Sequence, residues 1–138
     1  MRLPIQIEAI LFNRTNGKIQ YLLLKRISRR GGFWQPITGG LEEGETKIEA
    51  LRREIREETG IKDIIKIIED VHYHEFLDPH LVKEYVFGVE VSSDEKVILD
   101  EREHSEFKWC SFQEALNLAE YEEYRDALKK LDRILSHV

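Results

Sequence analysis

The sequence predicts an α+β fold, an αβα sandwich around a mixed β-sheet, built as one domain over residues 1–138. Three observations support this fold class. Strand-like segments occupy most of the chain before residue 111, one amphipathic helix is inserted early among them, and helical segments close the sequence. A chain of 138 residues is also long enough to bury a hydrophobic core.

The first two strands are expected at the N-terminus. Residues 3–12 are predicted to form a strand because apolar and other residues alternate through Ile5, Ile7, Ala9 and Leu11. The dipeptide Asn16-Gly17 indicates a hairpin turn. The apolar run at 21–24 then predicts a buried second strand.

A helix is predicted over residues 46–59, after a glycine turn at Gly39-Gly40. Thr46 and Glu49 have the spacing of a capping box, which fixes the start of the helix. Gly60 follows the helix and can adopt the left-handed conformation that ends it. At about 100° per residue, one face carries three apolar side chains, Ile48, Leu51 and Ile55.

The second half of the chain predicts three strands and two helices. Strands are expected at 64–71 and 84–91, joined by an irregular segment at 72–83, and a short strand is expected at 106–111. We interpret the irregular segment as a loop that covers a substrate, because long irregular segments often form lids. Its three histidines, His72, His74 and His80, also allow a zinc site as a less favoured interpretation.

A capping box at Ser111 and Glu114 opens the next helix. A final amphipathic helix presents one apolar face, made of Tyr124, Ala127, Leu128, Leu131, Ile134 and Leu135.

Composition limits the classes of function. The net charge of −6 argues against a broad nucleic-acid surface, which needs a basic stripe. No apolar run approaches the roughly 18 residues of a membrane span. The single cysteine, Cys110, excludes an intramolecular disulfide and fits packing on a strand in a reducing cytoplasm. We therefore expect a cytoplasmic protein that binds neither nucleic acid nor membranes.

The glutamates of the predicted helix form a candidate metal site. Glu54, Glu57 and Glu58 share a stripe about 100° away from the apolar face. Arg53 can offset their repulsion by pairing with Glu49 and Glu57. Oxygen ligands favour a hard cation, here Mg²⁺ with Mn²⁺ as a possible substitute. An ordinary glutamate-rich surface helix is the alternative, but the glycines and arginine at fixed spacings favour a metal site.

Residues 39–61 match the pattern G-x5-E-x7-R-E-U-x-E-E-x-G-U, where U is a bulky aliphatic residue, at every fixed position. The segment resembles the Nudix box, and this implies a Nudix fold and hydrolysis of a nucleoside diphosphate linked to another moiety. The resemblance implies that Glu54, Glu57 and Glu58 hold metal, that Arg53 and Glu45 brace the loop and helix, and that Gly39 and Gly40 let the backbone approach the site. It leaves the general base open between Glu54 and Glu103.

Two flanking segments extend the resemblance. The lead-in at residues 32–40 is similar to the W-Q-x-x-T-G signature of the dATP and dihydroneopterin triphosphate pyrophosphohydrolase subgroup. Residues 101–109 resemble an E-H-x-x-Y/F-K/R-W segment, which that subgroup shares with the diadenosine tetraphosphate hydrolases. The latter enzymes usually show W-x-x-P-K-G-H before the box, and this chain lacks the lysine and histidine. Glu103 is expected as an additional metal or catalytic carboxylate.

These observations predict a Mg²⁺-dependent Nudix pyrophosphohydrolase that cuts a nucleoside triphosphate or a related compound to a monophosphate and pyrophosphate. Asymmetric hydrolysis of a dinucleoside polyphosphate is the same-class alternative, and a non-catalytic nucleotide-binding domain is the other. The expected partner is a small nucleotide, bound by a monomer or a homodimer. The expected catalytic residues are Arg53, Glu54, Glu57 and Glu103, and the expected metal ligands are Glu54, Glu57, Glu58 and Glu103.

Five residues are expected to contact the substrate. Arg26 closes an apolar strand and is the candidate phosphate contact within the basic group Lys25, Arg26, Arg29 and Arg30, for which a solvated loop is the more favoured alternative. Gly39 and Gly40 supply backbone near the phosphates. Trp34 and Tyr85 are candidates for stacking on a base or pterin ring, although a role in core packing is at least as consistent with their positions.

Overall fold

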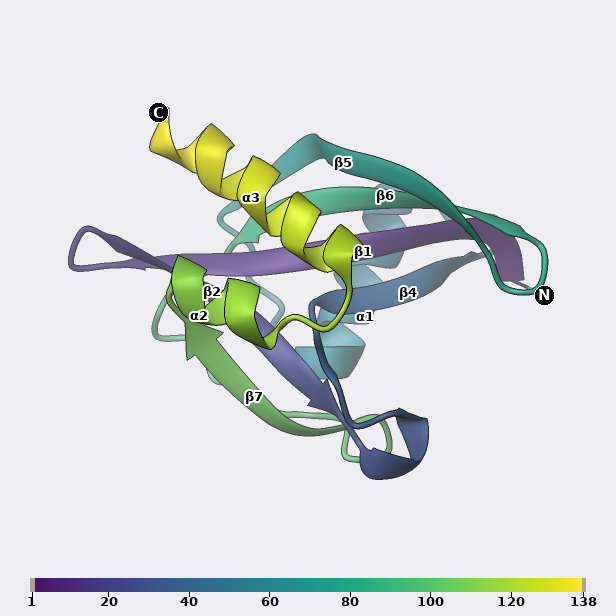
Figure 1. The fold of residues 1–138 in the computed structure, drawn as a ribbon, viewed down its shortest axis with the longest axis horizontal. Helices are drawn as coiled ribbons and strands as arrows, with labels where there is room; N and C mark the ends of the chain where they lie inside the picture. Colours follow the sequence, from purple (N-terminus) through teal and green to yellow (C-terminus); the bar gives the residue numbers. More distant parts are fainter. Residues whose placement is uncertain (1, 138) are drawn as a thin grey trace.

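The computed structural model describes residues 2–137, and within them the strands form one mixed sheet. The strands are β1 (Arg2–Thr15), β2 (Lys18–Arg26), β3 (Trp34–Gln35), β4 (Ile37–Glu42), β5 (Lys66–Leu77), β6 (Leu81–Glu90) and β7 (His104–Cys110). The helices are α1 (Lys47–Thr59), α2 (Phe112–Leu118) and α3 (Glu122–Ser136), with a short 3-10 helix at Ser28–Arg30. Helix α1 covers one face of the sheet, and α2 and α3 cover the other (Figure 1). The predicted α+β sandwich is confirmed.

Strand β1 connects the parts of the sheet. One of its edges pairs in parallel with β6, which in turn pairs with β5. The other edge pairs with β4 through the first half of β1 and with β2 through its last residues, and β2 also pairs with β3 and β7. Strands β4 and β2 thus pair with successive parts of the same edge of β1, and residues of both line the candidate cleft.

Two apolar clusters fill the space on either side of the sheet. On one side Leu51 and Ile55 of α1 are fully buried, and Ile48 is partly buried, as the predicted stripe requires. On the other side the buried residues of α3 are Ala127, Leu128, Leu131 and Leu135. Ile134 was expected on this apolar face, but 37% of it is exposed, so it lies at the edge of the packed stripe.

Two local predictions are confirmed at the level of the backbone. Asn16 and Gly17 both have positive φ, 51° and 76°, as the hairpin turn between β1 and β2 requires. Gly60 is also left-handed, with φ 75°, and ends α1. Cys110 is buried at the end of β7, and burial raises the pKa of its thiol to about 11, which fits a packing role.

The irregular segment predicted at residues 72–83 is wrong. Strands β5 and β6 continue through it as one antiparallel hairpin, with Tyr73 opposite Tyr85 and Leu77 opposite Leu81. Side chains from His72 to Leu77 alternate between half-buried and exposed positions, but polar residues occupy both sets. The alternation in burial therefore does not appear as an apolar pattern in the sequence. The interpretation as an irregular lid loop is also wrong, because these residues form paired strands.

The glycine turn predicted at Gly39-Gly40 is also wrong, because both residues lie in β4. Gly39 is opposite Ile7 and Gly40 is opposite Gln6 of β1. The chain turns after this strand, between Glu42 and Thr46. No helix in residues 2–137 has both the length and the apolar character needed to cross a membrane.

Glu8 is a buried carboxyl group in the middle of β1. It is fully buried, and neither of its carboxylate oxygens forms a hydrogen bond within the described part of the chain. Burial, reinforced by the nearby charge of Glu84, raises the pKa of the Glu8 carboxyl group well above its usual value. The folded protein therefore holds this proton more tightly than the unfolded chain does.

We expect Glu8→Gln to stabilise the protein more at pH 8 than at pH 5. A carboxyl group with a raised folded-state pKa loses stability as the pH rises above its unfolded-state pKa and through the folded-state pKa. Glutamine carries no such charge, so the gain should reach about 1–3 kcal/mol at pH 8. Urea unfolding at both pH values measures it, with Glu69→Gln on an exposed position of β5 as the control. An equal effect of Glu8→Gln at both pH values would contradict the prediction.

Candidate active site

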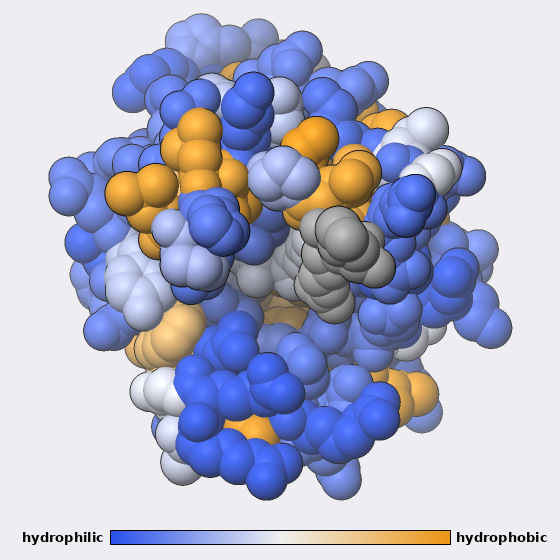
Figure 2. Space-filling view, turned by 90° about the vertical axis from the view of Figure 1, so that its right-hand side faces the viewer, coloured by the Kyte–Doolittle hydropathy of each residue, from blue (hydrophilic) through white to orange (hydrophobic). Residues whose placement is uncertain are grey.

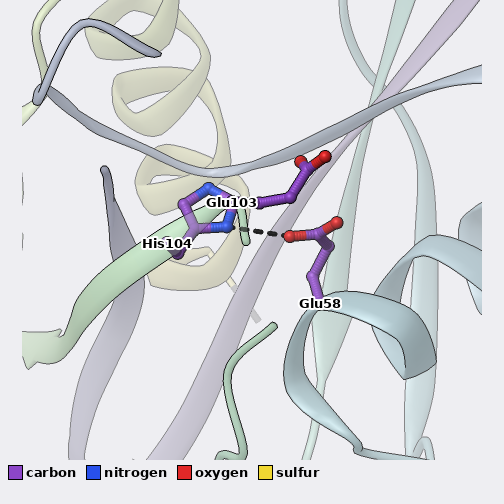
Figure 3. A group of neighbouring side chains, drawn as sticks. All are labelled: Glu58, Glu103 and His104. Atoms are coloured by element: carbon purple, nitrogen blue, oxygen red, sulfur yellow. Dashed lines mark ion pairs between the residues drawn. The ribbon is translucent and has the colours of Figure 1, made fainter. Parts of the chain in front are cut away.

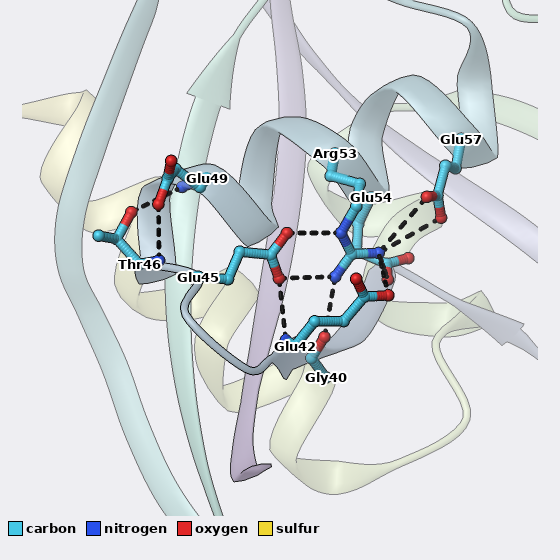
Figure 4. A network of polar contacts seen from close by, with 8 residues as sticks. All are labelled: Gly40, Glu42, Glu45, Thr46, Glu49, Arg53, Glu54 and Glu57. Atoms are coloured by element: carbon cyan, nitrogen blue, oxygen red, sulfur yellow. Dashed lines mark hydrogen bonds and ion pairs between the residues drawn. The ribbon is translucent and has the colours of Figure 1, made fainter. Parts of the chain in front are cut away.

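Helix α1 begins where the sequence predicted. The Thr46 side chain accepts a hydrogen bond from the Glu49 backbone N–H, and the Glu49 carboxylate accepts one from the Thr46 N–H (Figure 4). Before the helix, the Glu45 carboxylate accepts a hydrogen bond from the Glu42 backbone N–H at 2.9 Å. These contacts fix the turn between β4 and α1 relative to the helix.

Arg53 joins this turn to the acidic side of the helix (Figure 4). Its guanidinium donates two hydrogen bonds to Glu45, at 2.6 and 3.0 Å, and one to the Gly40 carbonyl oxygen at 3.0 Å. It also donates to Glu54 at 2.8 Å and contacts Glu57 at 3.4 Å. The predicted pairing of Arg53 with Glu57 is present. The predicted pairing with Glu49 is not, because the Glu49 carboxylate caps the helix instead.

Glu54 is the most buried of the three helix glutamates that line the cleft, with its carboxyl group packed over β4. Burial raises the pKa of this carboxyl group to about 7, against the opposing effect of Arg53. A carboxylate with such a pKa is suited to accept a proton near neutral pH. Glu58 is also buried, whereas the Glu57 side chain is 50% exposed and reaches solvent.

Gly39 leaves the space that the Glu54 carboxyl group occupies. A Cβ atom built on Gly39 would overlap the Cγ, Cδ and Oε1 atoms of Glu54. The glycine is therefore required by close approach of strand and helix, since its backbone is ordinary β-strand.

The Gly39→Ala variant should lose activity about tenfold or more while remaining folded. The new methyl group displaces Glu54, and a small misplacement of a catalytic group is costly. Steady-state turnover of a substrate that the wild-type protein hydrolyses measures the effect. Gly88→Ala is a matched control, because its Cβ would lie 2.6 Å from the Leu131 side chain on α3, outside the residues that line the cleft. Equal losses of specific activity in the two folded variants would contradict this explanation.

The acidic side of α1 faces a cleft of about 640 Å³. The lining residues come from β1, β2, β4, α1 and the segments before β3 and β7, and they are Gln6, Arg26, Arg30, Thr38, Gly39, Gly40, Glu54, Glu57, Glu58, Asp100, Arg102 and Glu103. The cleft thus gathers the expected carboxylates and the two glycines. It also gathers three arginines, Arg26, Arg30 and Arg102, which suit phosphate oxygens.

A second group of ligand-type atoms lies deeper in the same region (Figure 3). Glu58, Glu103 and His104 each offer one atom, and these atoms lie within 4.8 Å of one another. His104 Nδ1 is 2.8 Å from Glu58 Oε2, yet neither atom forms a hydrogen bond with the described residues. Arg30 contacts Glu103 at 3.8 Å from the other side.

These residues fit a divalent cation. Carboxylate oxygens are the ligands that Mg²⁺ and Mn²⁺ accept, and Glu54, Glu57, Glu58 and Glu103 line one cleft. The buried oxygen of Glu58 without a hydrogen-bond partner is a further sign, because buried charged groups in proteins are paired or bind metal.

Trp34 and Tyr85 do not line the cleft. Trp34 is half-buried against the apolar cluster on the α3 side, and Tyr85 packs on the α1 side with Lys47 over its ring at 3.8 Å. Within the described part of the chain, His72, His74 and His80 do not form the zinc site that the sequence allowed. Among the described residues the one group with metal-ligand geometry is Glu58, Glu103 and His104.

Five polar residues that line the cleft were not among the expected site residues: Gln6, Arg30, Thr38, Asp100 and Arg102. Sequence reasoning also left His104 without a role, although the residue stands inside the segment that resembles a family motif. Asp100 directly precedes that segment and Arg102 lies within it, so proximity to Glu103 was the available signal. Thr38 is the threonine of the W-Q-x-x-T-G signature in the lead-in, which was the available signal, whereas Gln6 lies on a strand that looks purely structural in the sequence.

Beside the cleft runs an apolar groove of about 530 Å³ that shares Gln6 and Gly40 with it. Its other lining residues come from the start of β1 and the turn between β5 and β6, namely Leu3, Pro4, Ile5, Phe76, Asp78, His80, Leu81 and Val82. The face that carries these segments is mostly hydrophilic, with separate apolar patches (Figure 2).

The sequence matches the NUDIX domain family model over residues 4–131. It is 38% identical over 133 residues to an octanoyltransferase of Myxococcus xanthus, a match that covers 92% of this chain but 36% of that protein. It is 30% identical over 132 residues to the asymmetrical bis(5'-nucleosyl)-tetraphosphatase of Caenorhabditis elegans, covering 92% of this chain and 93% of that one.

A shorter match is 45% identical over 71 residues to the nucleoside triphosphatase NudI of Salmonella heidelberg, covering 49% of this chain and 48% of that one. Among solved structures, a putative NUDIX hydrolase of Listeria monocytogenes superposes with a TM-score of 0.85. That structure is 30% identical in sequence, and the superposition covers 98% of this chain and 96% of the other.

Proposed function

The chain belongs to the NUDIX family, and from this premise we propose that it is a metal-dependent pyrophosphohydrolase which cleaves a nucleoside triphosphate, or a related diphosphate-linked compound, to a monophosphate and pyrophosphate. The single observation that carries the proposal is the composition of the cleft. Four glutamates and three arginines line one opening of about 640 Å³, which is the combination that a metal-bound polyphosphate requires.

The acidic residues hold the cation. Glu57 and Glu58 come from the last turns of α1, Glu54 lies one turn earlier, and Glu103 approaches from the segment before β7. When bound, Mg²⁺ neutralises phosphate oxygens and makes a water molecule more acidic. Arg53 keeps Glu54 and Glu57 on one side of the helix and ties them to the Gly40 carbonyl, so the carboxylates are positioned before substrate arrives.

Glu54 is the favoured general base. Its carboxyl group is buried at the cleft, where it can take a proton from the attacking water. The water oxygen bonds to phosphorus, the bond from that phosphorus to the bridging oxygen breaks, and pyrophosphate leaves. Glu103 is the second candidate for the base, because it lines the cleft opposite α1.

The arginines of the cleft would contact phosphate oxygens of the substrate. Arg26 is fixed by a hydrogen bond from Nε to the Arg30 carbonyl oxygen at 3.0 Å and by stacking over Phe33. The remaining N–H groups of its guanidinium are available to a phosphate. Arg102 forms an ion pair with the Asp100 carboxylate at 3.0 Å, and its side chain is 86% exposed.

Asymmetric hydrolysis of a dinucleoside polyphosphate is the second candidate. Two observations favour it: the similarity to the Caenorhabditis elegans tetraphosphatase extends over almost the whole of both chains, and the apolar groove that adjoins the cleft leaves room for a second nucleoside. The lead-in to the box lacks the lysine and histidine expected for this group and favours the triphosphate substrate.

A product assay tests both candidates. The purified protein is incubated with Mg²⁺ and dATP, other nucleoside triphosphates, dihydroneopterin triphosphate, diadenosine tetraphosphate or ADP-ribose, and the products are separated. Pyrophosphate released from a triphosphate supports the first candidate. ATP and AMP from diadenosine tetraphosphate, with triphosphates intact, support the second. Nucleotide binding without any product would refute both and indicate a binding domain.

A further inference from the structure

His104 stands beside the carboxylates without a role in the proposed reaction. Its side chain is 3% exposed, that of Glu58 is 8% exposed, and their Nδ1 and Oε2 atoms are 2.8 Å apart. Both atoms are buried and lack hydrogen bonds within residues 2–137, although the distance would suit one. The contact therefore has the length of a hydrogen bond without its direction.

A shared cation explains that geometry. Two atoms that each lie about 2.1 Å from one ion, at adjacent positions of an octahedron, are about 3.0 Å apart. Their lone pairs then point toward the ion and not toward each other. Glu103 supplies a third atom within 4.8 Å of the other two, and it comes from a different part of the chain than Glu58 (Figure 3).

The other ring nitrogen decides whether Nδ1 is free to bind. The Gln35 amide nitrogen lies 3.2 Å from His104 Nε2, and the Gln35 amide oxygen accepts a hydrogen bond from the Tyr124 hydroxyl at 3.2 Å. Rotating the Gln35 amide by 180° exchanges its oxygen and nitrogen and leaves the rest of the side chain in place. With the oxygen toward His104, Nε2–H donates to Gln35, the amide donates to the Tyr124 oxygen, and Nδ1 keeps its lone pair.

We propose that His104 Nδ1, Glu58 and Glu103 bind a divalent cation in a mixed nitrogen and oxygen site, which favours Mn²⁺ or Co²⁺ over Mg²⁺. The inference deepens the proposed function, because it names the preferred cation of the same cleft. An imidazole ligand suits first-row transition ions, whereas Mg²⁺ prefers oxygen ligands alone. Arg30 lies 3.8 Å from Glu103 and offsets part of the negative charge of the two carboxylates. The remaining negative charge favours a bound cation.

Pulsed electron paramagnetic resonance of bound Mn²⁺ tests the ligand directly. The electron spin-echo spectrum of the full chain with Mn²⁺ should contain the modulation of a directly bound nitrogen, and the pattern should change when histidine is labelled with nitrogen-15. His104→Gln should abolish it. His74→Gln is the matched control, because His74 is also paired with a buried carboxylate, that of Glu84, and it should keep the modulation. No nitrogen modulation in the wild type, or its persistence in His104→Gln, would overturn the proposal.

Affinity provides the second readout. Titration calorimetry with Mn²⁺ and with Mg²⁺ should show that His104→Gln weakens Mn²⁺ binding at least about tenfold, with a smaller effect on Mg²⁺. Equal losses for both ions would contradict a nitrogen ligand.

A measurement on the wild type covers the case in which His104→Gln does not fold. Nitrogen-15 spectra of the imidazole rings, recorded with and without diamagnetic Zn²⁺, should show a shift of the unprotonated His104 Nδ1 when the ion binds. A proton on Nδ1 in both spectra would refute the proposal, because a protonated ring nitrogen cannot bind metal. These experiments need no turnover, so an inactive protein with a bound nitrogen would sink the proposed function alone.

Discussion

Glu57→Gln is expected to lower kcat at least about 100-fold, which corresponds to about 2.7 kcal/mol of transition-state stabilisation. The reason is the loss of one anionic ligand for a cation that must neutralise phosphate charge. Stability should change by less than about 0.5 kcal/mol, because the Glu57 side chain is 50% exposed and its contact with Arg53 is long, at 3.4 Å. Steady-state kinetics and urea unfolding together separate the two effects.

The control for this variant is Glu43→Gln, which removes the same charge from an exposed position in the turn before α1. It should keep the kcat of the wild type. Raising the Mg²⁺ concentration should restore part of the Glu57→Gln activity, since a weakened site fills at a higher concentration. A folded Glu57→Gln protein with near-normal kcat would remove Glu57 from the set of ligands.

The sequence predicts α1 well because its determinants are local. Thr46 and Glu49 are three residues apart and cap each other, and Gly60 ends the helix by its own conformation. The acidic stripe follows from helix geometry alone. Each of these features is decided within one or two turns, so no knowledge of the rest of the chain is needed.

The partners of Arg53 show where local reasoning stops. Glu49 lies at the right spacing on the helix, but its carboxylate is used in the cap, and Arg53 instead reaches Glu45 and the Gly40 carbonyl. Those two partners lie 8 and 13 residues away, in the turn and in β4. Only the return of the chain from β4 into α1 brings them together.

The deeper part of the site depends on contacts that are longer still. His104 and Glu58 belong to β7 and α1, the Gln35 side chain reaches His104 from β3, and Tyr124 of α3 contacts Gln35. None of these pairs has a fixed spacing in the sequence. Residues 72–83 were not predicted as strand for a related reason. They are held in the hairpin by pairing between β5 and β6, and their sequence lacks the alternating apolar pattern that indicates a strand.

Arg53→Ala is expected to destabilise the metal-free protein by about 3 kcal/mol at pH 8. The guanidinium is 14% exposed and pairs with Glu45 and Glu54, whose side chains are 14% and 5% exposed. Removing it leaves both carboxylates without their main partner in a poorly solvated place. Arg53→Lys should fall between, because lysine keeps the charge but cannot donate to Glu45, Glu54 and the Gly40 carbonyl from one planar group.

The loss should be smaller at pH 5.5 than at pH 8. Arg53 lowers the pKa of Glu54, which burial alone would raise further than about 7, so the variant holds the Glu54 proton more tightly. A carboxyl group with a raised folded-state pKa makes the protein less stable as the pH rises toward that value. At pH 5.5 the Glu54 carboxyl group of the variant is protonated, so this loss is absent. Urea unfolding at the two pH values measures the difference. Arg52→Ala changes an exposed arginine one residue earlier and should cost less than about 0.5 kcal/mol. Equal losses for the two arginine variants would mean that the network around Arg53 positions the carboxylates without stabilising the fold.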